Sequence, residues 1–287
     1  MTLSLLEQSL LAGLVVGIIA ALVALGFTLV LGILGIVNFA HGNQLMIAMY
    51  LALYGSQALG LNPFASSLII TPVMFVLGLG IYAVMMRWLI DKPHSTHVAG
   101  TIGLMLLLEN VVNLVVGGTP KTVDAGFSSA SIAIHDTYLP VSRVLAAGLA
   151  AVAVLALYLF LRRTDLGLAT RACADNFQGA RVTGLRINRV FAVSFALSVA
   201  AAGLAGAALS SHQTMTPFVG HAYLSTAFAV VILAGAGNIL GTIVSGIFVG
   251  LVQALTQTLF DASIGTAVLF VLIMVTLLVR PQGLFAR

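Results

Sequence analysis

Residues 8–17, Gln-Ser-Leu-Leu-Ala-Gly-Leu-Val-Val-Gly, begin the tract that decides the fold, because no Asp, Glu, Lys or Arg occurs between Glu7 and Arg87. A second tract without charged side chains lies between Arg189 and Asp261. An ionised side chain at the centre of a bilayer costs about 2.5–3.5 kcal/mol on insertion scales. Such tracts are stable in lipid and would aggregate in water. The sequence therefore predicts a protein embedded in a membrane.

Composition supports an all-α, polytopic bundle of transmembrane helices in a single domain, residues 1–287. The chain is 60% hydrophobic and 7% charged, which excludes an ordinary soluble domain. A span needs about 20 apolar residues, so the chain has room for about eight or nine, some of them broken or re-entrant. No segment shows an alternating strand pattern, which argues against a barrel. The expected spans are residues 8–34, 37–60, 65–87, 99–117, 141–161, 190–211, 223–236, 239–259 and 265–279.

The arginines predict the orientation of the chain. Six of the 12 basic residues lie within 162–189, and the positive-inside rule places that segment in the cytoplasm. Counting spans from there puts loop 118–140 outside and the C-terminus, with Arg280 and Arg287, inside. The net charge of +4 is thus explained by topology and not by a nucleic-acid partner. The side of the N-terminus stays open, because a re-entrant segment near Asn38 would change the number of crossings.

Cysteine usage and the first residues add two expectations. Cys173 is the only cysteine, so neither an intrachain disulfide nor a cysteine metal cluster can form, and we expect no metal site. The first residues lack the basic region of a cleaved signal peptide, so we expect the first helix to be retained.

Small residues four apart predict close helix contacts, because helices in lipid associate through packing. The contacts lie either within the chain or between subunits. The pairs are Gly13 with Gly17, Gly203 with Ala207, Gly237 with Gly241 and Gly246 with Gly250.

Residues 32–44 interrupt an apolar stretch with polar side chains and three glycines. One interpretation is a broken span on a transport pathway, since non-helical backbone at membrane depth survives only inside protein or beside a watery cavity. The alternative is a polar loop between two helices whose imidazole is bonded to a backbone carbonyl. The candidate pathway residues are Asn38, His41, Gly42, Asn43 and Gln44.

Residues 171–189 have mixed polarity and predict a short amphipathic helix on the cytoplasmic face. Asp175 is suited to a helix start and Gly184 to a helix stop. The alternative is a solvated loop whose arginines only fix topology.

Glu109 is an acid inside an apolar segment and therefore a possible intramembrane polar site. It is either hydrogen-bonded to Asn110 or Asn113 in a helix contact, or a proton-coupling acid of a secondary transporter. A lone acid without an embedded Asp, Lys or Arg partner makes a poor relay, which weighs against the second role.

Four motifs in order resemble the LivH-type permeases of branched-chain amino acid ABC transporters. The second is similar to that family's cytoplasmic coupling segment, about residues 165–189 here. The motifs are Val37-Asn-Phe-Ala-His-Gly42 with Gln44-Leu-Met46; Arg171-Ala-Cys-Ala-Asp175 with Ala180-Arg-Val-Thr-Gly-Leu185 and Asn188-Arg189; Phe228–Gly241; and Leu278–Phe285.

The resemblance implies a permease of the bacterial inner membrane that pairs with a second, related permease. Two cytoplasmic ATPase subunits and a periplasmic binding protein that delivers an amino acid would complete the importer. The chain's only lysines, Lys92 and Lys121, lie outside any phosphate-binding loop, so ATP and Mg would be used by the partners and this chain would bind no cofactor and be no enzyme. The residues implied in ATPase coupling are Asp175, Gly179, Ala180, Arg181 and Gly184.

Three other functions stay open. Permeases of this family are thought to serve urea, short amides and other small solutes as well. A secondary transporter or channel would work without an ATPase. A purely structural membrane subunit would make no substrate contacts, and the polar break at 38–44 argues against it.

Overall fold

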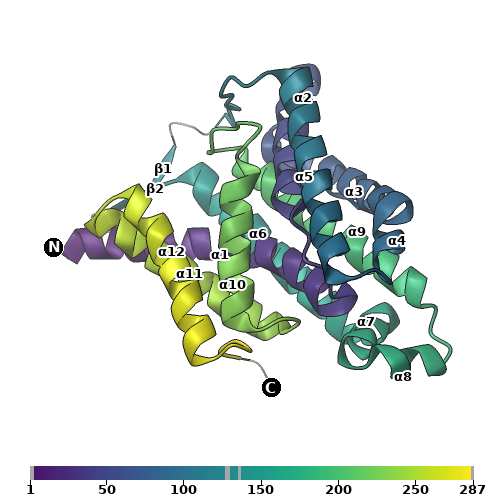
Figure 1. The fold of residues 1–287 in the computed structure, drawn as a ribbon. Helices are drawn as coiled ribbons and strands as arrows, with labels where there is room; N and C mark the ends of the chain where they lie inside the picture. The colour runs from purple at the N-terminus through teal and green to yellow at the C-terminus, as the bar shows by residue number, and fades with distance from the viewer. Residues whose placement is uncertain (1–2, 127–129, 135–136, 286–287) are drawn as a thin grey trace.

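Long apolar helices make up most of the protein (Figure 1). The structure is a computed structural model and describes residues 3–126, 130–134 and 137–285. Within those residues, six helices are long and apolar enough to cross a membrane, and two shorter apolar helices accompany them. The elements are α1 (Leu3–Leu34), α2 (His41–Leu59), α3 (Pro63–Ile81), a π-helical turn η1 (Tyr82–Met86), α4 (Arg87–Leu89), α5 (His94–Val116), β1 (Ser131–Ile134), β2 (Thr137–Pro140), α6 (Val141–Arg163), α7 (Asp165–Asp175), α8 (Phe177–Val182), α9 (Ile187–Leu209), α10 (Gly220–Ala234), α11 (Ile239–Leu259) and α12 (Ala262–Val279).

Each apolar segment expected from the sequence contains a helix, with ends that differ by a few residues. Helix α10 has 15 residues, which is fewer than the roughly 20 that a straight crossing needs. Helix α2 begins with a run of polar side chains. Six crossings are therefore supported by length and apolarity, and the predicted total of about eight or nine stays a prediction.

Asparagines determine where two of the long helices begin. The Asn62 side chain accepts a hydrogen bond from Phe64 N at 3.0 Å, and Pro63 takes the first helical position of α3. Asn238 accepts one from Gly241 N at 2.9 Å and caps α11. Both caps lie in turns that the Gly, Pro and Asn pattern marks in the sequence.

A small β-hairpin departs from the all-α prediction. Strands β1 and β2 pair antiparallel, with Ser131 opposite Pro140, in the connection between α5 and α6. Each strand has four residues, too few for an alternating pattern to be recognised. The same connection joins the α9–α10 loop, where backbone hydrogen bonds of 2.9 and 2.8 Å link Lys121 and Met215.

Glycines allow α1 and α11 to lie in close contact. A Cβ atom at Gly17 would lie 2.7 Å from Ile247 Cα, and one at Gly246 would lie 2.6 Å from Ala21 Cα, closer than carbon atoms pack. In α9, a Cβ at Gly203 would lie 2.6 Å from the Met74 side chain of α3. The small residues singled out in the sequence thus serve packing within the chain.

Helix α1 runs through the centre of the bundle and contacts α6, α9, α10 and α11. Helix α5 lies at the edge, packs chiefly on α2 and leaves Leu107, Leu114 and Val115 exposed. The connection between α1 and α2, residues 35–40, includes Ile36 and Ala40, which are fully buried. This non-helical backbone is thus enclosed by protein, as membrane depth requires.

Candidate substrate pathway and coupling segment

Residues 38–44 lead into α2 and form its first turn. Their polar side chains are buried and form hydrogen bonds within the protein. We call residues 38–44 the α2 start segment. Asn38 Oδ1 accepts a hydrogen bond from Ala40 N at 3.1 Å, and Asn38 Nδ2 donates to Gln44 Oε1 at 3.3 Å. Asn43 Nδ2 donates to the Met105 carbonyl of α5 at 2.9 Å. Asn38, Asn43 and Gln44 are each at most 1% exposed. Their amides thus connect the segment to itself and to α5.

His41 bonds a backbone carbonyl, as one of the two interpretations of this segment expected. Its Nε2 lies 2.9 Å from the Val23 carbonyl of α1, and its ring lies 5.6 Å from the Phe27 ring, centroid to centroid. The other ring nitrogen, Nδ1, is buried without a hydrogen-bond partner. His41 therefore joins α2 to α1.

Gly42 lies against another helix. A Cβ atom built on Gly42 would overlap the carbonyl group of Gly220, the first residue of α10. Glycine at position 42 thus allows α2 and α10 to approach backbone to backbone. The backbone of Gly42, one of the candidate pathway residues, faces α10 in this structure.

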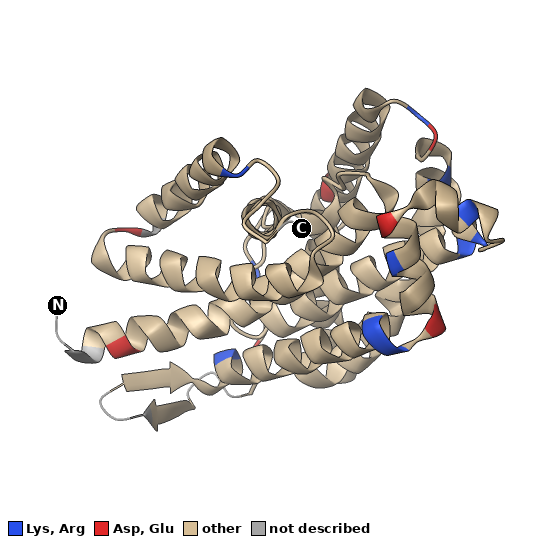
Figure 2. Cartoon of the chain, turned by 90° about the horizontal axis from the view of Figure 1, so that it is seen from below, with Lys and Arg blue, Asp and Glu red and all other residues tan. Residues whose placement is uncertain are grey.

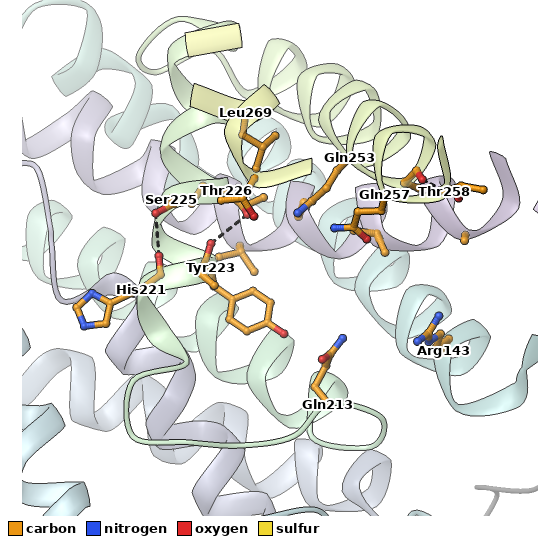
Figure 3. A pocket seen from close by; sticks show the side chains of 18 residues that line it. Arg143, Gln213, His221, Tyr223, Ser225, Thr226, Gln253, Gln257, Thr258 and Leu269 are labelled. Carbon is orange, nitrogen blue, oxygen red and sulfur yellow. Dashed lines mark hydrogen bonds between the residues drawn. The ribbon is translucent and has the colours of Figure 1, made fainter. Parts of the chain in front are cut away.

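A cavity of about 560 Å³ opens between α1, α10, α11 and α12, beside the start of α6 and the α9–α10 loop (Figure 3). We call it the polar cavity. None of the α2 start segment lines it, but Val23 does, so His41 lies directly behind the cavity wall. Its polar lining comprises Arg143, Gln213, His221, Tyr223, Ser225, Thr226, Gln253, Gln257, Thr258 and Thr266.

Several long polar side chains from different elements point toward the same space. In Figure 3 the Tyr223 ring of α10 and the Gln213 side chain of the α9–α10 loop extend toward the middle of the cavity. Gln253 and Gln257 of α11 reach it from the other side, and Arg143 at the start of α6 lies across from Tyr223. The His221 imidazole points away. The cavity thus offers amide, hydroxyl and guanidinium groups to a polar solute.

The charged residue of the cavity lining is a cation. Among its lining residues Arg143 carries a formal charge, and no Asp or Glu belongs to the lining. Nearby, burial and then the charge of Arg143 lower the pKa of His212 to about 4 from its ordinary 6.5. His212 is therefore neutral at neutral pH.

Glu109 of α5 is paired with His221 of α10. The two side chains approach to 2.9 Å, with Glu109 9% exposed and His221 48% exposed. The expected contact with Asn110 or Asn113 is wrong, since Asn110 Nδ2 instead donates to the Leu106 carbonyl of its own helix. A histidine 112 residues further along the chain supplies the partner of Glu109.

The arginine-rich segment folds into two short helices instead of one. Asp175 is the last residue of α7, and Asn176 caps α8 by accepting a hydrogen bond from Gly179 N at 2.8 Å. Asp175 thus lies near a helix start, as predicted, but the residue that caps α8 is Asn176. Gly184 has a φ of +80°, a conformation that favours glycine, and follows the end of α8 as expected.

The side chains of α8 divide into a buried and an exposed face. Ala180 is 5% exposed and packs into the core, whereas Val182 is 89% exposed. Arg181 is exposed as well. In Figure 2 most of the ribbon segments coloured blue, which are Lys and Arg, gather toward one end of the bundle. Helices α7 and α8 lie at that end, with an exposed apolar residue among the charges.

Sequence reasoning missed the cavity. Gln253 and Gln257 lie four apart in a helix without charged residues, and this spacing places both amides on one face. That signal was available in the sequence. Arg143, Gln213 and Tyr223 carry no comparable signal. Groups of three or more His, Cys, Asp or Glu that could hold a metal ion do not occur within residues 3–126, 130–134 and 137–285.

Apolar helices around a polar cavity, with an arginine-rich segment at one end, define a multi-pass membrane protein of the kind that moves a solute. The family described as "Branched-chain amino acid transport system / permease component" matches residues 9–278, and the chain belongs to this family. Its permeases are subunits of ABC transporters and are not enzymes. Membership implies ATPase and binding-protein partners.

Two curated relatives and one solved structure are similar to this chain over most of its length. The high-affinity branched-chain amino acid transport system permease protein LivH of Salmonella typhimurium is 29% identical over 98% of this chain and 95% of its own. The ribose import permease protein RbsC of Escherichia coli K12 is 27% identical over 80% of this chain and 72% of its own. The solved structure is PsaBC from Streptococcus pneumoniae in complex with Fab. The match covers 97% of this chain and 92% of the matched chain, at a TM-score of 0.53 and 14% identity, and it supports the fold alone.

Proposed function

We propose that this chain is the membrane permease of an ATP-driven importer for branched-chain or related amino acids, in the bacterial inner membrane. A periplasmic binding protein delivers the solute, a second related permease completes the pathway, and two ATPase subunits supply the energy. The observation that carries the proposal is the polar cavity in a chain that matches the family over residues 9–278. In such a subunit, neutral amides and hydroxyls at the helices give a passing solute transient contacts without trapping it.

Uptake measurements test this function. Cells with and without the gene are given labelled leucine, urea and acetamide. We expect leucine uptake to fall when the gene is deleted and to return when it is restored, with uptake unchanged when the proton gradient is dissipated and ATP maintained. Loss of urea or acetamide uptake alone would assign the permease to those solutes. Uptake that follows the proton gradient would identify a secondary transporter.

Helix α8 is the proposed contact with the ATPase, within the coupling segment 165–189. Ala180 and the left-handed Gly184 fix its shape, and Val182 and Arg181 project from it. A Val side chain that is 89% exposed beside arginines fits a partner with an apolar groove and an acidic rim. A short helix held in such a groove transmits ATPase closure to the membrane helices as a rigid-body movement.

The docking role is tested with Val182→Asp, which alters an exposed side chain and leaves the fold intact. We expect the ATPase that co-purifies with the permease to fall by about tenfold, because a buried interface would receive an unpaired charge. Val182→Ile is the matched control and retains the partner. Undiminished ATPase recovery with the Asp variant would exclude this docking surface.

Orientation follows from the arginines, with α8 and the C-terminus in the cytoplasm and the α5–α6 connection outside. Single cysteines are placed at Asn176 and at Gly126 in a Cys173→Ala background. The two thiols should differ in their reactivity with a membrane-impermeant reagent added from outside. Only position 126 should react in intact cells. Cys173 itself is 2% exposed, and burial raises the pKa of its thiol, which slows its reaction. Labelling at 176 from outside would reverse the orientation.

A further inference from the structure

Arg143 is a cation in the lining of the polar cavity. It lies in the first turn of α6 and is exposed, and none of the described acidic residues forms an ion pair with it. Because the lining contains no carboxylate, its positive charge is not neutralised inside the cavity. A guanidinium group binds a carboxylate with two parallel hydrogen bonds, which makes arginine suited to recognising that group.

The groups near Arg143 can complete the contact with a carboxylate without competing for the arginine. Gln213, Gln253 and Gln257 bring amide donors from the α9–α10 loop and α11, and Tyr223 brings a hydroxyl from α10 (Figure 3). Burial, and after it the charge of Arg143, lowers the pKa of His212, so this neighbour is neutral at neutral pH. The lining therefore presents one cation and several neutral hydrogen-bonding groups to an anionic group.

Part of the cavity lining is apolar. Val16 and Val23 of α1 and Leu269 of α12 belong to the lining, together with small alanines. A solute that occupies the cavity therefore meets a cation, hydrogen-bonding groups and aliphatic side chains. Urea, short amides and free sugars would leave the cation without an anionic partner.

We propose that Arg143 recognises the carboxylate of the transported solute, so that the cavity selects small carboxylates with an aliphatic side group. The inference deepens the proposed function and rests on it, since it names the chemical feature that the permease reads. Arg143 makes the contact, and the amides of Gln253 and Gln257 orient the solute beside it.

Transport by the complete importer tests the role of Arg143. Arg143→Gln should lower the maximal rate of leucine uptake by about tenfold or more, because a charge-assisted hydrogen bond pair is lost, and Arg143→Lys should retain part of it. Lys121→Gln is the control, since it removes one positive charge from the loop next to Met215 without touching the cavity. Unchanged leucine uptake in Arg143→Gln would overturn the proposal.

Three further outcomes count against the proposal or against the function on which it rests. If Arg143→Gln raises only the binding-protein concentration that gives half-maximal uptake, Arg143 docks the binding protein instead of the solute. If the wild-type importer takes up urea or acetamide but no carboxylate, the proposal fails while the permease function stands. If it takes up no solute at all, the proposed function itself fails.

A binding measurement separates the inference from transport. In the purified importer, Thr258→Cys with Cys173→Ala places a thiol at the cavity lining. Isovalerate, a carboxylate with an aliphatic chain, should slow labelling of this thiol, and isoamylamine, which carries the same chain without the carboxylate, should not. Arg143→Gln should remove the protection. Equal protection by both compounds, or protection that survives Arg143→Gln, would contradict carboxylate recognition whatever the uptake results.

Discussion

The α2 start segment and the polar cavity are both rich in uncharged polar groups, but the protein uses them differently. Asn38 and Gln44 bond one another and are fully buried, whereas Gln257 of the cavity is exposed and Gln253 half-buried. The first two residues of α10 separate the regions, because Gly220 packs on Gly42 and His221 belongs to the cavity lining. Polar side chains in a membrane protein thus form a pathway only where their hydrogen-bonding groups stay available to a solute.

A pathway role for the α2 start segment stays a prediction. In the present arrangement, a solute would reach Asn38 or His41 only if α2 moved away from α1 and α10. The segment instead supports the cavity from behind, through the bond of His41 to the Val23 carbonyl. Three experiments probe the contrast between a sealed region and an open one.

The largest effect is expected for Gly42→Ala. The added methyl group would overlap the Gly220 carbonyl, and forcing α2 and α10 apart costs about 3 kcal/mol. Most of the folded permease should be lost, as measured by its amount after detergent extraction and size-exclusion chromatography. Gly103→Ala, where the new methyl group enters open space on α5, should leave the amount unchanged. Equal yields from both variants would show that the α2–α10 contact is not tight.

A smaller effect is expected for Asn38→Leu. The buried N–H of Ala40 loses its acceptor, which costs about 1–3 kcal/mol. The amount of folded permease should fall, while leucine uptake per folded molecule stays near the wild-type value. Asn110→Leu is the control, because Asn110 bonds only its own helix. Normal abundance with abolished uptake per molecule would place Asn38 on the pathway and remove the contrast between the two regions.

The smallest effect concerns the pH dependence of stability through His212, which precedes the lining residue Gln213. The pKa of His212 is about 4 in the folded protein, against an ordinary value of 6.5 that we assign to the unfolded chain. Between pH 4 and pH 6.5 the unfolded chain therefore binds more protons than the folded protein. Stability is therefore full above pH 6.5 and decreases as pH falls toward 4, by at most about 2 kcal/mol at pH 5. The midpoint of thermal unfolding in detergent should drop between pH 7 and pH 5. His212→Gln should reduce that drop, and an identical pH profile in the variant would assign the effect to other groups.

Much of the architecture was predictable because it depends on neighbouring residues. Asn62 and Asn238 lie in the breaks between expected apolar segments, where the structure has helix starts, and the small residues of α1 and α11 predicted a tight contact. The hairpin β1–β2 escaped prediction because four-residue strands lack a detectable period. The single helix expected at the coupling segment is two helices, since the Asn176 side chain caps α8 directly after α7 ends.

The sequence by itself determined that this protein lies in a membrane, which end of it carries the arginines, and which motifs place it beside the branched-chain amino acid permeases. Those properties depend on local sequence, because the transfer free energy of a segment is a sum over its residues and each helix cap depends on a few neighbours. Only the tertiary structure decided which polar groups face a cavity and which are sealed. Glu109 meets His221 across 112 residues, and Arg143 reaches the same cavity as Gln257 from a different helix. Such convergence depends on how the helices pack against one another, and packing is set by the shapes of whole helix surfaces that no local pattern contains.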